Sequence, residues 1–191
     1  MARTVGGVLL AAGLGTRFEG GNKLLAEIDG RPVVRRAAST LAGTPLDGIV
    51  AVLGHEAEAV KTALEGLDLT TRHNEDYTRG QSTSVAVGVA AARERGWDAA
   101  VFALGDMPFV DPGTVDRLLA AYADGTGSVL APAHEGTRGN PVLFDSRHFE
   151  ALADVTGDRG GRDIVADVGT LVAVDDPGVR RDVDRRRDLD T

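Results

Sequence analysis

Two basic residues lie in a glycine-rich segment that follows the first apolar run of the chain. Gly13 and Gly15 come directly after that run, and Arg17 and Lys23 lie six residues apart across the segment. Glycine lets backbone amides approach a phosphate closely, and amides arranged in this way carry fixed partial positive charge. The two cations can therefore close on a triphosphate from two sides. The alternative is a tight turn with solvated basic side chains, but a lysine in a chain of 19 arginines and two lysines favours phosphate binding.

Two common phosphate-binding motifs do not match this segment. A dinucleotide-binding fingerprint needs a third glycine at the position of Phe18, and an acidic residue at the end of the second strand, where Leu53-Gly54-His55 stands instead. A Walker loop needs glycine before its lysine and Ser or Thr after it, whereas Asn22 and Leu24 flank Lys23. The segment belongs to neither class.

A carboxylate follows a strongly apolar run at residues 99–104. Asp106 lies in the tetrapeptide Gly105-Asp106-Met107-Pro108, just after that run. Hard cations such as Mg²⁺ take oxygen ligands, and the end of a buried strand is where such an ion can bridge phosphate oxygens. The alternative is a carboxylate that accepts hydrogen bonds from the amides of a turn.

The elements that must position these residues alternate between strand and helix. Apolar runs rich in β-branched residues predict strands at 4–12, 46–53, 69–73, 98–104, 128–131, 141–144 and 170–174. Helical spacing of apolar residues predicts helices at 32–41, 56–64, 82–95, 112–123, 146–154 and 162–168. We expect Asp111 to cap the helix that begins at Pro112, and Ser82 or Thr83 to cap the alanine-rich one. This order predicts a single α/β domain over 1–191, a Rossmann-like three-layer α/β/α fold with a mainly parallel sheet. Such a sheet binds ligands beyond the carboxyl ends of its strands.

Composition and charge exclude several classes of function. The chain has 29 acidic and 21 basic residues, a net charge of −8 and no cysteine. A nucleic-acid partner would need a basic face, and no apolar run is long enough to span a membrane. The absence of cysteine excludes disulfides, thiolate metal sites and a cysteine nucleophile. The four histidines share no helical face and predict neither a zinc site nor a Ser-His-Asp hydrolase: His55, His73, His134 and His148.

The first segment carries a resemblance to a known family. Leu-Ala-Ala-Gly-x-Gly-x-Arg-Phe followed by Lys resembles the signature loop of the MobA-like nucleotidyltransferases, and within them most closely the molybdenum cofactor cytidylyltransferase group. Guanylyl-transferring relatives typically read Leu-Ala-Gly-Gly here, so Ala12 favours the cytidylyl group. Residues 80–84 resemble the Gly-x-Ser-x-Ser segment that lines the base and ribose. The resemblance implies catalytic roles for Arg17, Lys23 and Asp106. The nucleotide-binding residues that it implies are Leu10, Ala11, Ala12, Gly13, Gly15, Lys23, Gly80, Ser82, Ser84 and Asp106.

Two further carboxylates come from the same comparison. Gly-Asp-Met-Pro resembles the family's metal motif, and residues 181–189 resemble its Asp-Ile-Asp-Thr-Pro-Glu-Asp-Leu segment. In this register Asp106 and Asp184 hold Mg²⁺, with Asp182 as the fallback. Arg185-Arg186-Arg187 replaces Thr-Pro-Glu, so the signal for a helix start is weaker here. The alternative is a solvated tail of mixed charge.

Residues 138–141 resemble the family's Gly-x-Pro motif, and residues 157–162 resemble its Gly-Asp-x-Gly motif. In the family both motifs face a pterin with a terminal phosphate. A strand entry and a turn with solvated arginines are the alternatives. The acceptor-binding residues implied are Arg138, Gly139, Asn140, Pro141, Gly157, Asp158, Arg159 and Gly160.

Together these motifs imply transfer of CMP from CTP to the phosphate of a molybdenum-bearing molybdopterin, with release of pyrophosphate. We expect a monomeric, cytoplasmic, Mg²⁺-dependent enzyme that binds neither nucleic acid nor membrane and serves a recipient molybdoenzyme. Three alternatives remain open: a guanylyltransferase that uses GTP, a sugar-1-phosphate nucleotidyltransferase, and a non-catalytic nucleotide sensor.

Overall fold

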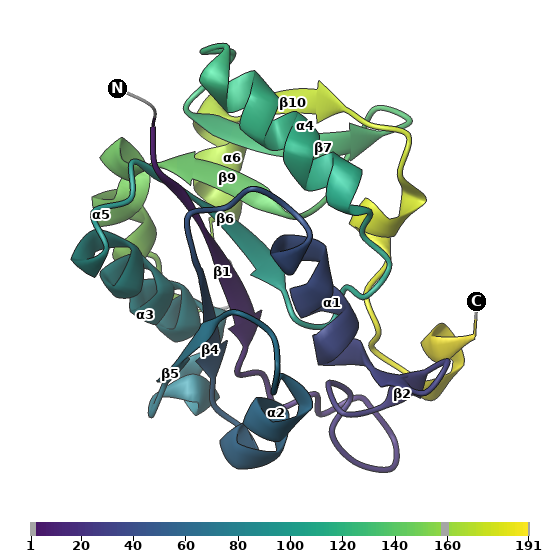
Figure 1. Ribbon diagram of the computed structural model, residues 1–191. Helices are drawn as coiled ribbons and strands as arrows, with labels where there is room; N and C mark the ends of the chain where they lie inside the picture. The colour runs from purple at the N-terminus through teal and green to yellow at the C-terminus, as the bar shows by residue number, and fades with distance from the viewer. Residues whose placement is uncertain (1–2, 158–160, 191) are drawn as a thin grey trace.

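The computed structural model describes residues 3–157 and 161–190, which form one mixed sheet between two layers of helices (Figure 1). The sheet strands are β1 (Val5–Ala11), β4 (Ile49–Leu53), β5 (Thr70–His73), β6 (Ala99–Leu104), β7 (Val129–His134), β8 (Thr137–Arg138), β9 (Val142–Asp145) and β10 (Thr170–Ala173). The helices are α1 (Val33–Ala42), α2 (Ala57–Ala63), α3 (Gln81–Glu94), α4 (Pro112–Ala123), α5 (Phe149–Ala153) and α6 (Arg162–Val168). The three-layer α/β/α prediction is confirmed.

The sheet is parallel around its centre, and β8 and β9 pair antiparallel with their neighbours. Its order is β10-β7-β9-β6-β1-β4-β5, with β8 paired to β7. β1 runs parallel to β4 and β6, whereas β9 is antiparallel to both of its neighbours. In this arrangement the carboxyl ends of β1, β4 and β6 meet at one edge: the amide of Gly105 donates to the carbonyl of Leu10, and that of His55 to the carbonyl of Ala12.

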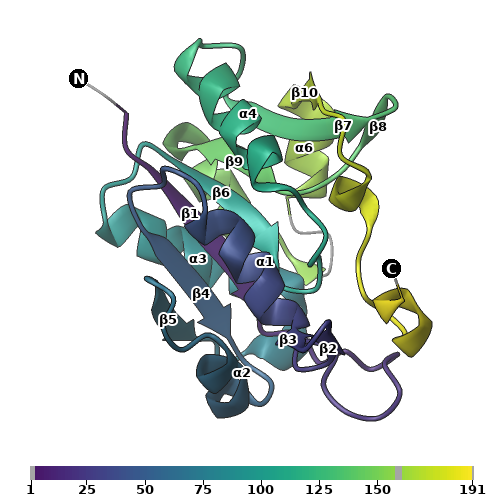
Figure 2. The same ribbon diagram turned by 45° about the vertical axis from the view of Figure 1, so that its right-hand side comes forward.

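Apolar side chains fill both faces of the sheet. One cluster joins β1, β4 and β6 to α1, α2 and α4, and the other joins them to α3, α5 and α6 (Figure 2). Helix α3 lies close to β1 at Gly88, where an added Cβ would stand 2.5 Å from Cγ1 of Val8. This close packing fixes the start of α3 relative to the loop after β1. None of the described helices is long and apolar enough to cross a membrane.

The N-cap predicted from the sequence is confirmed for α4 but not for α3. Asp111 caps α4, because its side chain accepts a hydrogen bond from the amide of Gly113 at 2.7 Å. The expected cap of α3 by Ser82 or Thr83 is wrong: the N-cap is Gly80, with a φ of +110° and no side-chain cap bond. The Thr83 hydroxyl instead donates to the carbonyl of Gly80 at 2.8 Å. The backbone conformation at Gly80 therefore sets the direction in which the chain enters α3.

Small elements that the periodicity does not predict surround the carboxyl edge of the sheet. They are the hairpin β2 (Glu27–Ile28) with β3 (Arg31–Pro32) and the 3₁₀ turns η1 (Tyr77–Arg79), η4 (Pro177–Arg180) and η5 (Arg186–Leu189). The predicted helix at 146–154 divides into the 3₁₀ turn η2 (Ser146–His148) and α5. The C-terminal segment crosses to the hairpin, and Val183 packs with Ile28 and Val33.

Candidate active site

Lys23 lies between two carboxylates that come from distant parts of the chain. Its Nζ stands 2.6 Å from Oδ2 of Asp106 and 2.9 Å from Oδ1 of Asp184. Asn22 and Leu24, the residues that flank Lys23, are buried, and this anchors the lysine stem in the fold. Arg17 donates to the other oxygen of Asp184 at 3.1 Å, but its side chain is 75% exposed. Four of the sequence-predicted residues thus form one charged cluster.

The charges of this cluster shift one another's protonation. Burial alone would lower the pKa of Lys23, but attraction from Asp106 and hydrogen bonds to both carboxylates raise it above its usual range. The hydrogen bond from Lys23 is the main reason why the pKa of Asp184 lies below its ordinary value. Burial, followed by repulsion from Asp106, raises the pKa of Asp182. The site therefore holds Lys23 charged and concentrates negative charge beside it.

Three carboxylates are close enough to share a metal ion. Asp106, Asp182 and Asp184 each offer an oxygen, and these atoms lie within 4.8 Å of one another. The amide of Val183 donates to the carbonyl of Asp106 at 2.8 Å, which holds the C-terminal segment against the loop after β6. Oxygen ligands of this kind suit Mg²⁺ or Mn²⁺. The residues present fit a divalent cation, and they place Asp182 beside Asp184 in the cluster.

The run of three arginines does not remove the short helix expected after Asp184. One carboxylate oxygen of Asp188 accepts hydrogen bonds from the amides of Asp184 and Arg185, at 3.0 and 2.6 Å. Asp188, which matches the aspartate of the family's Asp-Leu pair, thus closes this turn without the proline. The backbone at Asp184 is held in place despite the changed sequence.

A cavity of about 600 Å³ opens beside the charged cluster. The glycine-rich segment forms one wall through Gly13 and Gly15, and Lys23 and Asp106 line its end. Ala11 and Ser82, which we expected to bind nucleotide, are buried and are not part of the wall. The lining residues are Leu10, Ala12, Gly13, Leu14, Gly15, Thr16, Lys23, Leu24, Tyr77, Thr78, Arg79, Gly80, Gln81, Ser84, Leu104, Asp106, Gly157, Arg162 and Asp182.

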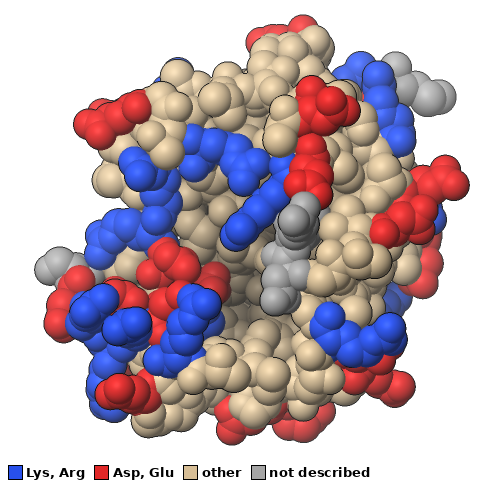
Figure 3. Space-filling view, turned by 180° about the vertical axis from the view of Figure 1, so that it is seen from behind, with Lys and Arg blue, Asp and Glu red and all other residues tan. Residues whose placement is uncertain are grey.

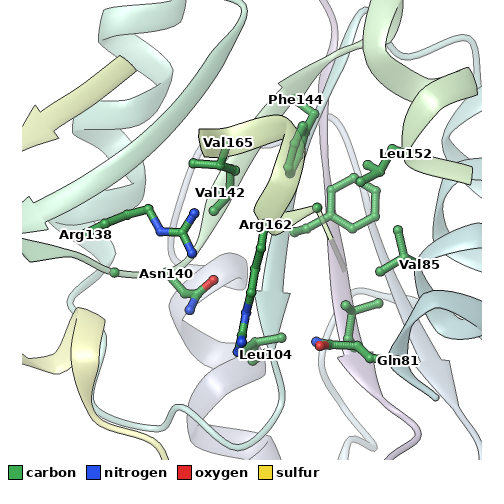
Figure 4. A pocket seen from close by; sticks show the side chains of 14 residues that line it. Gln81, Val85, Leu104, Arg138, Asn140, Val142, Phe144, Leu152, Arg162 and Val165 are labelled. Atoms are coloured by element: carbon green, nitrogen blue, oxygen red, sulfur yellow. The ribbon is translucent and has the colours of Figure 1, made fainter. Parts of the chain in front are cut away.

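A second, smaller cavity of about 220 Å³ adjoins the first and shares Leu10, Gln81, Leu104 and Arg162 with it. Its floor is apolar, with side chains from α3, β6, β9, α5 and α6, and the Arg138 guanidinium points into it (Figure 4). The lining residues are Leu10, Gln81, Val85, Phe102, Leu104, Arg138, Gly139, Asn140, Val142, Phe144, Leu152, Gly161, Arg162 and Val165.

The expected acceptor residues divide between these cavities. Arg138, Gly139 and Asn140 line the second cavity, whereas Pro141 does not, and Gly157 lines the first cavity instead. Gly139 lies where η4 passes closely, since an added Cβ would meet the backbone and side chain of Val179. Three other expected acceptor residues lie outside the described part of the chain: Asp158, Arg159 and Gly160.

Among the described residues, two arginines at the second cavity have no acidic partner. In the described ranges 3–157 and 161–190, the guanidinium groups of Arg138 and Arg162 make no hydrogen bond or ion pair, whereas Arg17, Arg72 and Arg147 each bind a carboxylate. Basic side chains also border the hollow on this face of the molecule (Figure 3). In a chain with net charge −8, this unpaired pair makes the cavity favourable for an anion.

A comparison with known families identifies the chain. The sequence profile of the MobA-like NTP transferase domain matches residues 7–179, which include the glycine-rich segment and the loop after β6. The chain belongs to the MobA-like NTP transferase family. The expected membership of the family is confirmed, and the family and fold support a nucleotidyltransferase.

Relatives of this MobA-like chain carry varied names. It is 36% identical over 166 residues to nicotine blue oxidoreductase of Paenarthrobacter nicotinovorans, covering 83% of this chain and 79% of the relative. It is 31% identical over 140 residues to the bifunctional protein GlmU of Agrobacterium fabrum, covering 70% of this chain but spanning 30% of that longer protein.

Solved structures share the fold over nearly the full length. Rv0371c of Mycobacterium tuberculosis H37Rv superposes with a TM-score of 0.84 at 28% identity, covering 100% of both chains. A manganese complex of Rv0371c gives a TM-score of 0.79 at 27% identity, covering 97% of this chain and 95% of that one. The nucleotidyl transferase Mth528 of Methanothermobacter superposes at 0.83, with 24% identity over 98% and 94% of the chains.

Sequence reasoning missed one wall of the larger cavity. Tyr77, Thr78 and Arg79 line it from η1, and Gln81 lies between the two cavities. The signal available was the loop that follows the short strand β5, because loops after parallel strands gather at the carboxyl edge of the sheet. The MobA-like chain thus encloses this cavity with the segments after β1, β5 and β6.

Proposed function

We propose that this chain transfers CMP from CTP to the terminal phosphate of a molybdopterin-type acceptor, with Mg²⁺ as the divalent cation and pyrophosphate as the leaving group. One observation carries the proposal: the larger cavity, beside the glycine-rich segment, meets a smaller cavity that has an apolar floor and two arginines with no acidic partner among the described residues. A triphosphate suits the first cavity, and a flat apolar group with an anionic end suits the second.

The residues of the larger cavity support nucleotide binding. The backbone at Gly13 and Gly15 faces the space beside Lys23, where amides and an ammonium can bind phosphate oxygens. Ala12 supports CTP through its resemblance to the cytidylyl-transferring group. GTP is the nucleotide that a guanylyltransferase of the same fold would take.

The residues of the smaller cavity support a phosphorylated acceptor. Arg138 and Arg162 can bind its phosphate, and Phe102 and Phe144 provide apolar surface for a planar ring. The acceptor phosphate is already an anion near neutral pH, so the chemistry requires no general base. Catalysis then depends on positioning and charge stabilisation, as in phosphoryl transfer generally.

The carboxylate cluster supports the choice of a divalent cation. Asp106, Asp182 and Asp184 would hold the ion, whose bound charge would offset the negative charge of the reacting phosphates. Lys23 would bind oxygens of the leaving pyrophosphate, and Arg17 would add charge from the exposed side of the same segment. We also propose that the enzyme acts as a monomer in the cytoplasm and passes its product to a molybdoenzyme.

Thermal-shift titration with CTP, GTP, UTP and ATP, each with and without Mg²⁺, tests this proposal. A bound ligand raises the melting temperature by mass action, so CTP with Mg²⁺ should raise it most. A larger shift with GTP would favour the guanylyltransferase. Nucleotide binding without acceptor-dependent pyrophosphate release would favour the sensor.

The similarity to nicotine blue oxidoreductase over 83% of the chain favours a second candidate function. An oxidoreductase would use the smaller cavity, with its apolar floor, for a planar dye and the larger cavity for a nucleotide that donates hydride. The test is to measure, by absorbance, whether the chain oxidises a reduced nicotinamide dinucleotide in the presence of nicotine blue. Such oxidation would support this candidate over nucleotidyl transfer.

A further inference from the structure

The Lys23 ammonium occupies the space between two of the three carboxylates that fit a divalent cation. It stands within hydrogen-bond distance of Asp106 and Asp184, and its side chain is 11% exposed. An ion bound to the same two oxygens would lie close to a fixed positive charge. Since like charges at such separations repel strongly, the lysine and the ion compete for these carboxylates.

Lys23 has another set of partners within reach when the cavity holds a triphosphate. Its side chain lines the cavity beside the glycine-rich segment, and an added Cβ at Gly15 would lie 3.1 Å from Cγ of Lys23. The stem of the lysine is therefore packed against the segment, whereas rotation about its terminal bonds can turn the ammonium toward the cavity. Phosphate oxygens in that cavity would offer the hydrogen bonds that the carboxylates now accept.

The remaining charges do not replace Lys23. Arg17 contacts Oδ2 of Asp184 from an exposed position. Exposed ion pairs contribute little to the free energy of folding, so Arg17 offsets little of the repulsion among the carboxylates. Asp182 makes no ion pair with any residue in the described ranges. When the ammonium turns away, three carboxylates face one another, and among the described residues Arg17 is the cation that still forms an ion pair with one of them.

We propose that Lys23 blocks the divalent-cation site until a nucleotide triphosphate draws its ammonium away, so that the cation binds with the nucleotide or after it. The inference rests on the proposed function for the identity of the anion, but the competition between ammonium and cation stands without it. Lys23 in this way couples the metal site to the phosphate site.

Titration of the nucleotide-free protein with Mn²⁺, with unbound Mn²⁺ followed by electron paramagnetic resonance, tests this block. Lys23→Met should bind Mn²⁺ at least about tenfold more tightly than the unmodified chain, because one repelling unit charge is removed from the ligands. Lys23→Arg keeps the charge and should bind as weakly as the unmodified chain. Lys61→Met is the matched control, since Lys61 is the other lysine of the chain and lies exposed on α2.

Equal or weaker Mn²⁺ binding by Lys23→Met would overturn the proposal, as would equal tightening by Lys61→Met, which would reveal a general effect of net charge. The double variant Lys23→Met with Asp106→Asn should lose the gain and so locate the ion on the carboxylates. If circular dichroism shows that Lys23→Met does not fold, Lys23→Gln is measured by the same criterion. Tighter Mn²⁺ binding without any nucleotide-induced thermal shift would refute the proposed function and the release of Lys23 by nucleotide, and would leave only the competition between ammonium and cation supported. CMP transfer without tighter Mn²⁺ binding would refute the block alone.

Discussion

Arg138 and Arg162, which have no acidic partner among the described residues, should contribute differently to the binding of acceptor and of nucleotide. Arg138 lines the smaller cavity alone, whereas Arg162 lines both cavities. Arg138→Gln should therefore raise the KM for the acceptor and leave the KM for CTP unchanged. Arg162→Gln should raise both. Both substitutions remove one guanidinium charge, so the different effects on the two KM values would come from the different positions of the two arginines relative to the cavities.

The size of the effect follows from the hydrogen bonds that each substitution removes. A hydrogen bond to a charged group contributes about 1.5–3 kcal/mol, which corresponds to about a 10- to 150-fold change in affinity. Neither guanidinium has a partner among the described residues, and both side chains are exposed, so the free energy of unfolding should change by less than about 0.5 kcal/mol.

The assay is initial-rate pyrophosphate release, with the acceptor and CTP varied in turn. Arg117→Gln is the control, since Arg117 is exposed on α4, on the other face of the sheet. The assignment of the cavities would be wrong if Arg138→Gln raised the KM for CTP but not for the acceptor. An unchanged acceptor KM in both variants would contradict any role of the arginines in acceptor binding.

Three further predictions concern the metal cluster and the core. Asp106→Asn should lower the rate of transfer by about 10²–10³ and leave the chain folded, as judged by pyrophosphate release and circular dichroism; near-normal turnover would remove Asp106 from the site. Gly88→Ala should lower the free energy of unfolding by about 1–3 kcal/mol in urea, because its Cβ would stand 2.5 Å from Cγ1 of Val8, and an unchanged midpoint would contradict the close packing of α3. Burial and the hydrogen bond to Asp145 raise the pKa of Tyr122 to about 12. The unfolded chain ionises first, near pH 10, so the contribution of this tyrosine to stability is complete below pH 10 and is lost between pH 10 and 12. Tyr122→Phe should weaken the loss of stability over that range in urea titrations, and an identical pH dependence would refute this account.

Local patterns predicted the order of the elements and much of the site. The apolar run before Gly13 and the one before Asp106 are buried parallel strands, so the loops after them had to meet at one edge. That geometry brings Lys23 to Asp106 across 83 positions of sequence. The position of Asp184 came from a resemblance, and the structure places it within hydrogen-bond distance of Lys23.

The features that sequence did not predict depend on tertiary contacts. The carboxylate of Asp188 closes the turn after Asp184, and the sequence alone does not show that this hydrogen bond holds the turn where the proline is missing. Thr83 does not cap α3, because its hydroxyl donates to backbone carbonyls while a glycine takes the cap position. Gly157 lies on the wall of the larger cavity with Gly13 and Gly15, an arrangement in space that no local pattern encodes.

Acceptor-dependent transfer of the nucleotidyl group decides whether this chain is a cytidylyltransferase. The chain would be incubated with Mg²⁺, a molybdopterin-type acceptor and CTP or GTP, with pyrophosphate and the mass of the acceptor measured together. We expect pyrophosphate to appear only when acceptor and CTP are both present, and the acceptor to gain one CMP group. Absence of nucleotidyl transfer with either nucleotide, under conditions in which the nucleotide binds, would contradict this expectation.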